Sequence, residues 1–176
     1  MLEIGQKGPE FSLPGVDGTT VTLSGLLKNN RAVAVIFSCN HCPYVRAWED
    51  RMIAIQRDYA VQGVALVAIN SNDATKYPED DMEHMKTRAA ERGFNFPYLR
   101  DDSQAVARAY GGTHTPHVFL LDADGVLRYR GAIDDNYENP DAVQRSYLRD
   151  ALDAVLAGQS PATATTQAVG CTIKWK

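Results

Sequence analysis

Two unbroken apolar runs, residues 32–37 and 64–69, constrain the fold of this chain more than any other feature. A strand that is apolar on both faces is typical of the buried centre of a parallel sheet. Residues 43–59 lie between the runs and have the length of a helix that begins with a proline. The two runs and the helix therefore predict a strand–helix–strand unit with parallel strands.

Shorter patterns add further elements around this unit. Residues 8–18 and 20–23 have the composition of a short N-terminal β-hairpin. Asp124-Gly125 between two apolar runs is a strong signal for a second hairpin at the sheet edge. We therefore predict a three-layer α/β/α fold with parallel central strands. The other expected elements are helices at residues 78–92, 103–110 and 142–157 and strands at residues 98–100, 117–121 and 126–130.

The chain is expected to divide into one compact domain at residues 1–160 and a tail at residues 161–176. With 176 residues, 44% of them hydrophobic, it is long enough for one domain with its own core. Every second residue from Val169 to Trp175 is apolar, which is the period of a strand. We expect the tail to dock in extended form, on its own sheet edge or on a second copy in a homodimer.

The charge and the apolar pattern exclude some partners. The formal net charge is −4 and no stretch is strongly basic, so nucleic acid is not an expected partner. No apolar run approaches membrane-spanning length, and residues 1–5 lack the features of a signal peptide, so we expect a cytoplasmic protein without a membrane segment. Three cysteines are too few for a secreted disulfide framework.

The motif Cys39-Asn40-His41-Cys42 stands between the first apolar run and the predicted helix. Backbone N–H groups and the helix dipole favour an anion there, which lowers a cysteine pKa from about 8.5 into the range of about 3.5–7.5. We therefore predict thiol–disulfide exchange by a redox-active disulfide, without another cofactor. A closed zinc site needs four ligands, usually from two such cysteine pairs, and only Cys171 remains.

The motif, together with Thr115-Pro116 before a later strand, resembles the thioredoxin superfamily. Residues 5–13 and 170–176 are similar to peroxiredoxin-like proteins of the alkyl hydroperoxide reductase and thiol-specific antioxidant group. The resemblance covers essentially the whole chain. It implies a thioredoxin-like fold with an N-terminal β-hairpin and a C-terminal extended tail.

The resemblance also implies roles for individual residues. Cys39 would be the attacking thiolate and Cys42 the resolving thiol. Pro116 would follow a cis peptide bond, and Thr115 would offer backbone hydrogen bonds to a substrate chain. The substrate would be a disulfide-containing protein or a small thiol compound, and an external thiol reductant would restore the pair.

Two features of the motif depart from thioredoxin. The strand at residues 32–37 contains no acid, so the group that takes the proton of Cys42 is not identified. His41 lies between the cysteines, where it stabilises a nearby thiolate and makes the pair a stronger oxidant, or else is an exposed loop residue. Residues 70–73 follow the second parallel strand and are expected at the same sheet end as Cys39.

A thiol-dependent peroxidase is the first alternative function. Peroxiredoxins use a Pro-x-x-x-Thr-x-x-Cys pattern. Aligning its cysteine with Cys42 places Cys39 and Val35 at the threonine and proline positions, and aligning it with Cys39 places Ile36 and Ala32 there. Neither register fits, so a dedicated peroxide pocket is not expected.

The remaining alternatives concern a metal and the third cysteine. Cys39, Cys42 and His114 would converge on copper or zinc if the chain were a metal-binding module or chaperone. Cys171 lies on the apolar face of the tail, and we favour a structural role for it as a small buried hydrophobe. A third redox thiol, reached when the tail moves, is the other interpretation.

Overall fold

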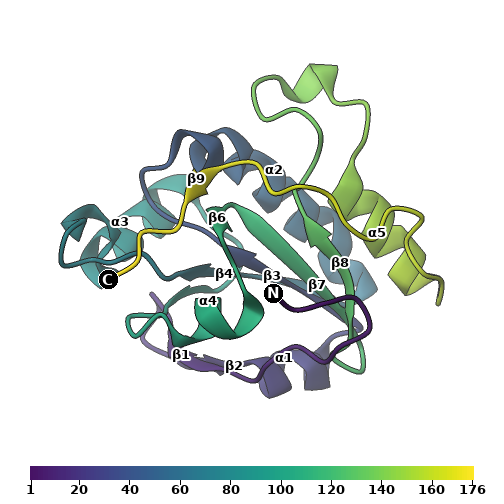
Figure 1. The fold of residues 1–176 in the computed structure, drawn as a ribbon, viewed down its shortest axis with the longest axis horizontal. Coiled ribbons are helices and arrows are strands. Elements are labelled where there is room, and N and C mark those ends of the chain that lie inside the picture. Colours follow the sequence, from purple (N-terminus) through teal and green to yellow (C-terminus); the bar gives the residue numbers. More distant parts are fainter.

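A computed structural model describes residues 1–176 and is built around a five-stranded sheet (Figure 1). The first three strands in spatial order run parallel to one another, and the last two are antiparallel to their neighbours. This is the predicted parallel centre with an antiparallel hairpin at the edge. In spatial order the strands are β5 (Tyr98–Arg100), β4 (Val64–Asn70), β3 (Ala32–Phe37), β7 (His117–Asp122) and β8 (Leu127–Gly131).

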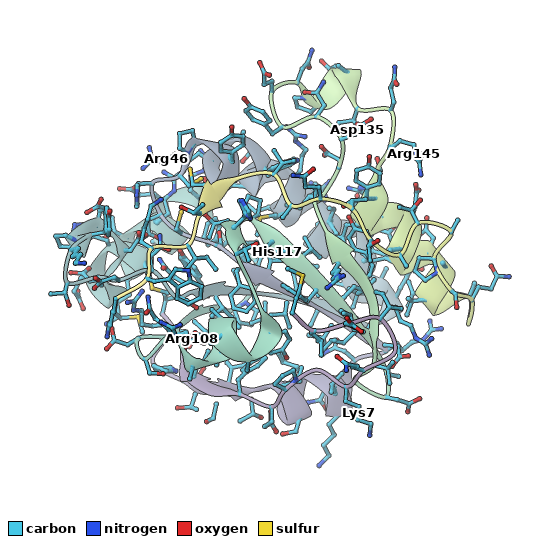
Figure 2. All side chains as sticks on the ribbon, viewed as in Figure 1. Lys7, Arg46, Arg108, His117, Asp135 and Arg145 are labelled. Atoms are coloured by element: carbon cyan, nitrogen blue, oxygen red, sulfur yellow. The ribbon has the colours of Figure 1, made fainter.

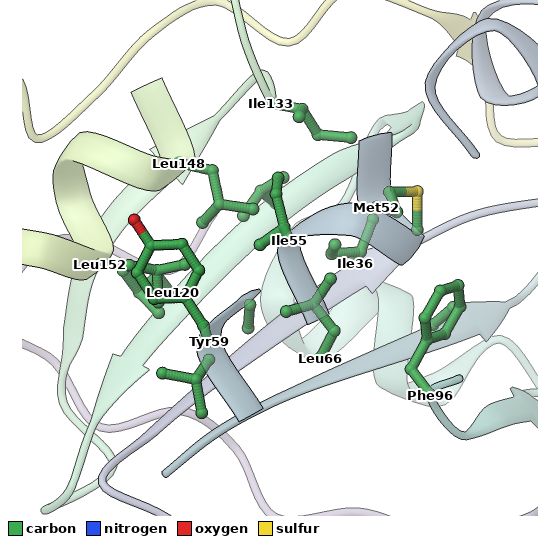
Figure 3. Packing of buried hydrophobic residues seen from close by; sticks show 14 of the residues in the cluster. Ile36, Met52, Ile55, Tyr59, Leu66, Phe96, Leu120, Ile133, Leu148 and Leu152 are labelled. Carbon is green, nitrogen blue, oxygen red and sulfur yellow. The ribbon is translucent and has the colours of Figure 1, made fainter. Parts of the chain in front are cut away.

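Helices and a small hairpin cover the two faces of the sheet. Alternate side chains of β3 point to opposite faces and are all buried, which explains its unbroken apolar sequence. On one face they pack against α2, α3 and α5, where Ile36, Met52 and Leu148 meet in the core (Figure 3). On the other face they pack against α1, α4 and the hairpin of β1 and β2. The three-layer α/β/α prediction is confirmed. The covering elements are β1 (Ser12–Pro14), β2 (Thr20–Thr22), α1 (Leu23–Asn29), α2 (Pro43–Tyr59), α3 (Met82–Arg92), α4 (Ala105–Tyr110) and α5 (Tyr147–Leu156).

Three helices begin later than the sequence predicts. The helix expected at residues 78–92 begins at Met82, because Asp81 caps it by accepting a hydrogen bond from the His84 backbone at 2.9 Å. Gln104 has a left-handed backbone, with φ of 67°, so α4 begins after it. The helix expected at residues 142–157 begins at Tyr147. Residues Pro140–Ala142 form a separate 3-10 turn, and a short loop joins this turn to the helix.

The tail docks on its own chain and crosses the molecule as the yellow segment of Figure 1. It first runs beside β8, where Arg130 exchanges backbone hydrogen bonds with Ala164 and Thr166 at 3.0 Å each. It then forms β9 (Cys171–Thr172), which pairs antiparallel with β6 (His114–Thr115). The tail is therefore extended as predicted, but only two of its residues form a strand.

Measured against the requirements of a bilayer-crossing helix, every helix of this fold is too short or too polar.

Candidate active site

The Cys39–Cys42 loop joins the carboxyl end of β3 to the start of α2. Ser38 continues β3 by one backbone hydrogen bond to Ile69 at 2.8 Å, and Cys42 then occupies the N-cap of α2. Pro43 follows at the first helical position, where its missing N–H costs nothing. The buried strand and the proline-started helix thus hold the motif at the end of the sheet where α/β folds place their ligands.

Thr115 contacts both cysteines of the motif. Its hydroxyl lies 3.5 Å from the Cys39 sulfur, and its carbonyl oxygen accepts a hydrogen bond from the Cys42 thiol at 3.5 Å. The Thr115–Pro116 peptide bond is cis. Cys39 and Cys42 are free thiols in this structure, and each is only 2% exposed.

The two motif cysteines shift each other's pKa in opposite directions. The hydrogen bond from Cys39 is the largest influence on Cys42, and with further bonds from Cys171 and the Val45 backbone it lowers the Cys42 pKa to about 4, against the effect of burial. The same hydrogen bond raises the Cys39 pKa, as do burial and the charge of Asp80. Cys42 also occupies the N-cap of α2, where the helix dipole favours an anion. The role of Cys39 as the attacking thiolate stays a prediction.

Asp80 is a buried acid at this site that sequence reasoning missed. Its side chain is fully buried and accepts hydrogen bonds from the backbone of Asn40 at 2.9 Å and from the side chains of Asn70 and Asn72 at 3.0 Å. Its other close neighbour is His41, whose Nδ1 lies 3.1 Å from Oδ2. Asp80 therefore fastens the cysteine loop to the loop that follows β4.

Two observations at this end of the sheet bear on the sequence prediction. Residues 70–73 lie beside the cysteine loop, as their place after a parallel strand predicts. Asp80 lies within the helix predicted over residues 78–92 and was not predicted as a site residue. The sequence signal that pointed to a buried acid was the set of amide donors Asn40, Asn70 and Asn72. Donors that are buried together need an acceptor among them.

The histidines flanking Thr115-Pro116 stay apart from the cysteines. The Nδ1 atom of His114 is 2.8 Å from the hydroxyl of Thr113. His117, labelled in Figure 2, is buried at the start of β7, and its Nδ1 accepts the Thr113 backbone N–H at 3.2 Å. Burial is the main cause that lowers the His117 pKa to about 4. Neither histidine belongs to the group of metal-ligating side chains that the structure gathers.

That group consists of Cys39, His41 and Asp80, whose ligand atoms lie within 4.8 Å of one another. The site expected from Cys39, Cys42 and His114 is therefore replaced by a different set of donors. A sulfur, an imidazole nitrogen and a carboxylate oxygen supply three ligands, one fewer than a closed tetrahedral zinc site.

Cys171 lies against the motif cysteines. It packs on the small apolar cluster of Cys39, Cys42 and Val45, and its strand position pairs with Thr115. Burial, followed by the hydrogen bond to Cys42, raises the Cys171 pKa to about 11. The structure thus gathers all three cysteine sulfurs of the chain in one place, with Cys171 as the half-buried member.

Comparison with known proteins gives a family model and a curated relative. The model described as the AhpC/TSA family matches residues 4–130. The thiol-disulfide oxidoreductase ResA of Halalkalibacterium halodurans is 26% identical over 127 residues, which are 72% of this chain and 67% of ResA.

Solved structures show the same architecture. A conserved protein of Geobacillus kaustophilus, described as uncharacterized, is 42% identical with a TM-score of 0.93, over 100% of this chain and 94% of that one. Peroxidoxin BcpB of Mycobacterium tuberculosis is 22% identical with a TM-score of 0.63, over 74% of this chain and 85% of that one. A thioredoxin-family thiol:disulfide interchange protein of Chlorobium tepidum is 24% identical with a TM-score of 0.61, over 74% and 87%. The fold is thioredoxin-like.

Proposed function

This chain belongs to the AhpC/TSA family, and we propose that it is a thiol–disulfide oxidoreductase whose redox centre is the Cys39–Cys42 pair. The observation that carries the proposal is the pair of free, buried cysteines between β3 and α2, both in contact with Thr115, which precedes the cis bond to Pro116. A thiolate, not a thiol, is the nucleophile of disulfide exchange, and the N-cap position and lowered pKa of Cys42 favour a thiolate in this pair. The oxidoreductase name of the curated relative ResA supports the same chemistry.

In the proposed reaction, Cys39 attacks one sulfur of a substrate disulfide as its proton passes to Cys42. A bond forms between Cys39 and the substrate, and the other substrate sulfur leaves as a thiolate. Cys42 then gives the proton to this thiolate and attacks Cys39, which releases the second substrate sulfur as a thiolate. The substrate has gained two electrons, and the protein holds a Cys39–Cys42 disulfide.

The substrate is a disulfide-containing protein or small thiol compound, and an external thiol returns the oxidised pair to the dithiol. The redox-active disulfide serves as the only cofactor. The carbonyl of Thr115 and the neighbouring His41 border the sulfurs and would contact the substrate. We place the reaction in the cytoplasm, because a reducing compartment suits a chain with an odd number of cysteines.

The test is reduction of insulin disulfides with dithiothreitol as the terminal reductant. We expect both C39S and C42S to fall to the rate of dithiothreitol alone. The two variants differ in a trapping experiment. C42S is expected to retain substrate as a mixed disulfide on Cys39, whereas C39S is not. Wild-type protein that fails to accelerate insulin reduction, while its circular dichroism shows a folded chain, would refute the proposal.

A thiol-dependent peroxidase is the second candidate function, because the family name includes the thiol-specific antioxidant proteins. The threonine position of the peroxiredoxin pattern is Cys39 when its cysteine is aligned with Cys42, so the polarising hydroxyl is missing from that place. We expect hydrogen peroxide consumption with dithiothreitol to stay near the uncatalysed rate in the wild type. Turnover that is fast in the wild type and absent in C39S and C42S would favour the peroxidase instead.

A metal-binding module is the third candidate. The three donors Cys39, His41 and Asp80 are the observation in its favour. Metal content of the purified protein separates it from the oxidoreductase. One equivalent of zinc or copper that is lost in H41A and kept in H114A would support the metal-binding function. Wild-type protein purified without bound zinc or copper would count against it.

A further inference from the structure

We propose that Cys171 is a third redox cysteine, which forms an intramolecular disulfide with Cys42 and so connects the buried pair to an external thiol. The inference rests on the proposed function, because it needs an oxidised Cys39–Cys42 pair as its starting point. It assigns the tail an active part in the reaction cycle, in place of the structural role favoured by the sequence.

The tail lies where a substrate chain would lie. The residue before Pro116 is the one that the family resemblance assigns to substrate backbone binding, and here its partner in an antiparallel pair is Cys171. A Cβ atom built on Gly170 would lie 2.1 Å from the Thr115 carbonyl oxygen. Only glycine allows the tail to approach that closely. The chain therefore supplies its own cysteine-bearing strand to the edge that faces the motif (Figure 1).

Exposure separates the three sulfurs. Cys39 and Cys42 are each 2% exposed, whereas Cys171 is half-buried. Cys171 packs against the cluster that contains Cys42, and it pairs with Thr115, whose carbonyl oxygen lies 3.5 Å from the Cys42 sulfur. A thiol reagent that meets the closed protein thus finds Cys171 first, and Cys171 lies beside the motif pair.

The tail is anchored to the loop that follows β4, so Cys171 is held in place. Lys174 donates its N–H to Asn72 at 2.9 Å, and its carbonyl accepts hydrogen bonds from the Asp73 backbone at 2.8 Å and the Gln104 side chain at 2.9 Å. Ile173 is 3% exposed and belongs to the core cluster on the α1 and α4 face of the sheet. Farther along, the Arg108 guanidinium, labelled in Figure 2, lies 4.6 Å from the ring centroid of Trp175.

The exchange balances without an added oxidant. In the oxidised protein, the Cys171 thiolate attacks Cys42. A Cys42–Cys171 bond forms as the Cys39–Cys42 bond breaks, and Cys39 takes up the proton that Cys171 released. Oxidation of Cys42 also removes its negative charge, which is one of the causes that raise the Cys171 pKa. An external thiol then attacks Cys171 and frees Cys42. A second external thiol attacks the external sulfur of this mixed disulfide and releases Cys171, so one external disulfide is made and two protein thiols are restored.

The experiment maps disulfides after titration with glutathione disulfide, acid quenching, alkylation and peptide mass spectrometry. In C39S we expect a Cys42–Cys171 bond. In the matched variant C42S we expect no Cys39–Cys171 bond, because Cys171 contacts Cys42. In C39S combined with G170A, which leaves every remaining sulfur unchanged and displaces the tail, we expect at least tenfold less of the Cys42–Cys171 bond.

Each outcome bears on one proposal. If C39S carries only glutathione mixed disulfides, or C42S and the G170A combination form the tail bond equally well, Cys171 is not a relay and the inference is overturned. C171S serves as the separate check on the proposed function. It is expected to form the Cys39–Cys42 disulfide as the wild type does, and failure there would overturn the oxidoreductase proposal itself.

Discussion

Replacing Asp80 with asparagine tests whether this buried carboxylate holds the cysteine loop in place. Oδ1 accepts the hydrogen bonds from Asn40 and Asn70, and Oδ2 accepts the one from Asn72. An asparagine keeps one oxygen, so its NH₂ group must face at least one of these donors. Asn72 does not adapt by rotating its amide, because its own oxygen accepts the Lys174 N–H.

The magnitude follows from the bonds that D80N breaks. A hydrogen bond to a charged group contributes about 1.5–3 kcal/mol, and a buried polar group left without a partner costs about 1–3 kcal/mol. We therefore expect D80N to lower the free energy of unfolding of the reduced protein by about 3 kcal/mol. Removal of the charge is also expected to lower the Cys39 pKa, since Asp80 is one of the causes that raise it.

Urea unfolding of the reduced protein, followed by circular dichroism, measures the first effect. E79Q is the matched control, because Glu79 is the preceding residue and its side chain is 45% exposed, so a change within about 0.5 kcal/mol is expected. The pH dependence of Cys39 alkylation, scored by mass spectrometry, measures the second effect. If D80N unfolds at the same urea concentration as E79Q, the argument from the buried hydrogen bonds is refuted.

Three further predictions use other parts of the structure. H41A is expected to make the reduction potential of the motif cysteines about 20–30 mV more negative, since loss of a group that stabilises the thiolate disfavours the dithiol. Equilibration with glutathione measures the potential, and an unchanged or less negative value contradicts the prediction. The pKa of His117 falls from 6.5 to about 4 on folding, so the folded state binds fewer protons, and its contribution is complete above pH 6.5 and lost as the pH falls toward 4. Urea unfolding at pH 7 and pH 4.5 should therefore show less acid destabilisation in H117N than in the wild type, by roughly 2–3 kcal/mol, and equal pH dependence would count against it. R51M leaves the mostly buried Asp134 without its ion-pair partner at 2.8 Å and is expected to cost about 3 kcal/mol in urea unfolding, whereas R57M, at an exposed pair, should cost less than about 1 kcal/mol.

The sheet and the helix after the motif were predictable because their signals are local. Residues 32–37 are apolar at every position, and only a strand buried on both faces requires that. The following helix was predicted over residues 43–59 and has these bounds, since Pro43 marks its start and Gly63, with φ of 82°, ends the 3-10 turn that follows it. The starts of α3 and α5 were less predictable, because several polar residues before each helix qualify as a cap.

The parts of the site that escaped prediction depend on contacts between distant residues. Asp80 is ordinary in its own segment, and its burial depends on donors from Asn40 and Asn70, which reach it from two other elements. The short β9 pairing is set by the position of Thr115 after folding.

The tail strand β9, which lies over the cysteine motif, also affects how easily the motif is oxidised irreversibly. Peroxides convert a cysteine thiolate to sulfenic and then irreversibly to sulfinic acid, and the hydrogen bond with Cys39 lowers the pKa of Cys42 and so favours this form. Cys42 is nevertheless 2% exposed, with Cys171 packed against it. Oxidants in solution therefore reach this sulfur only when the tail lifts. The contacts of Lys174 with the loop after β4 hold the tail in place, so they also shield Cys42 from oxidants.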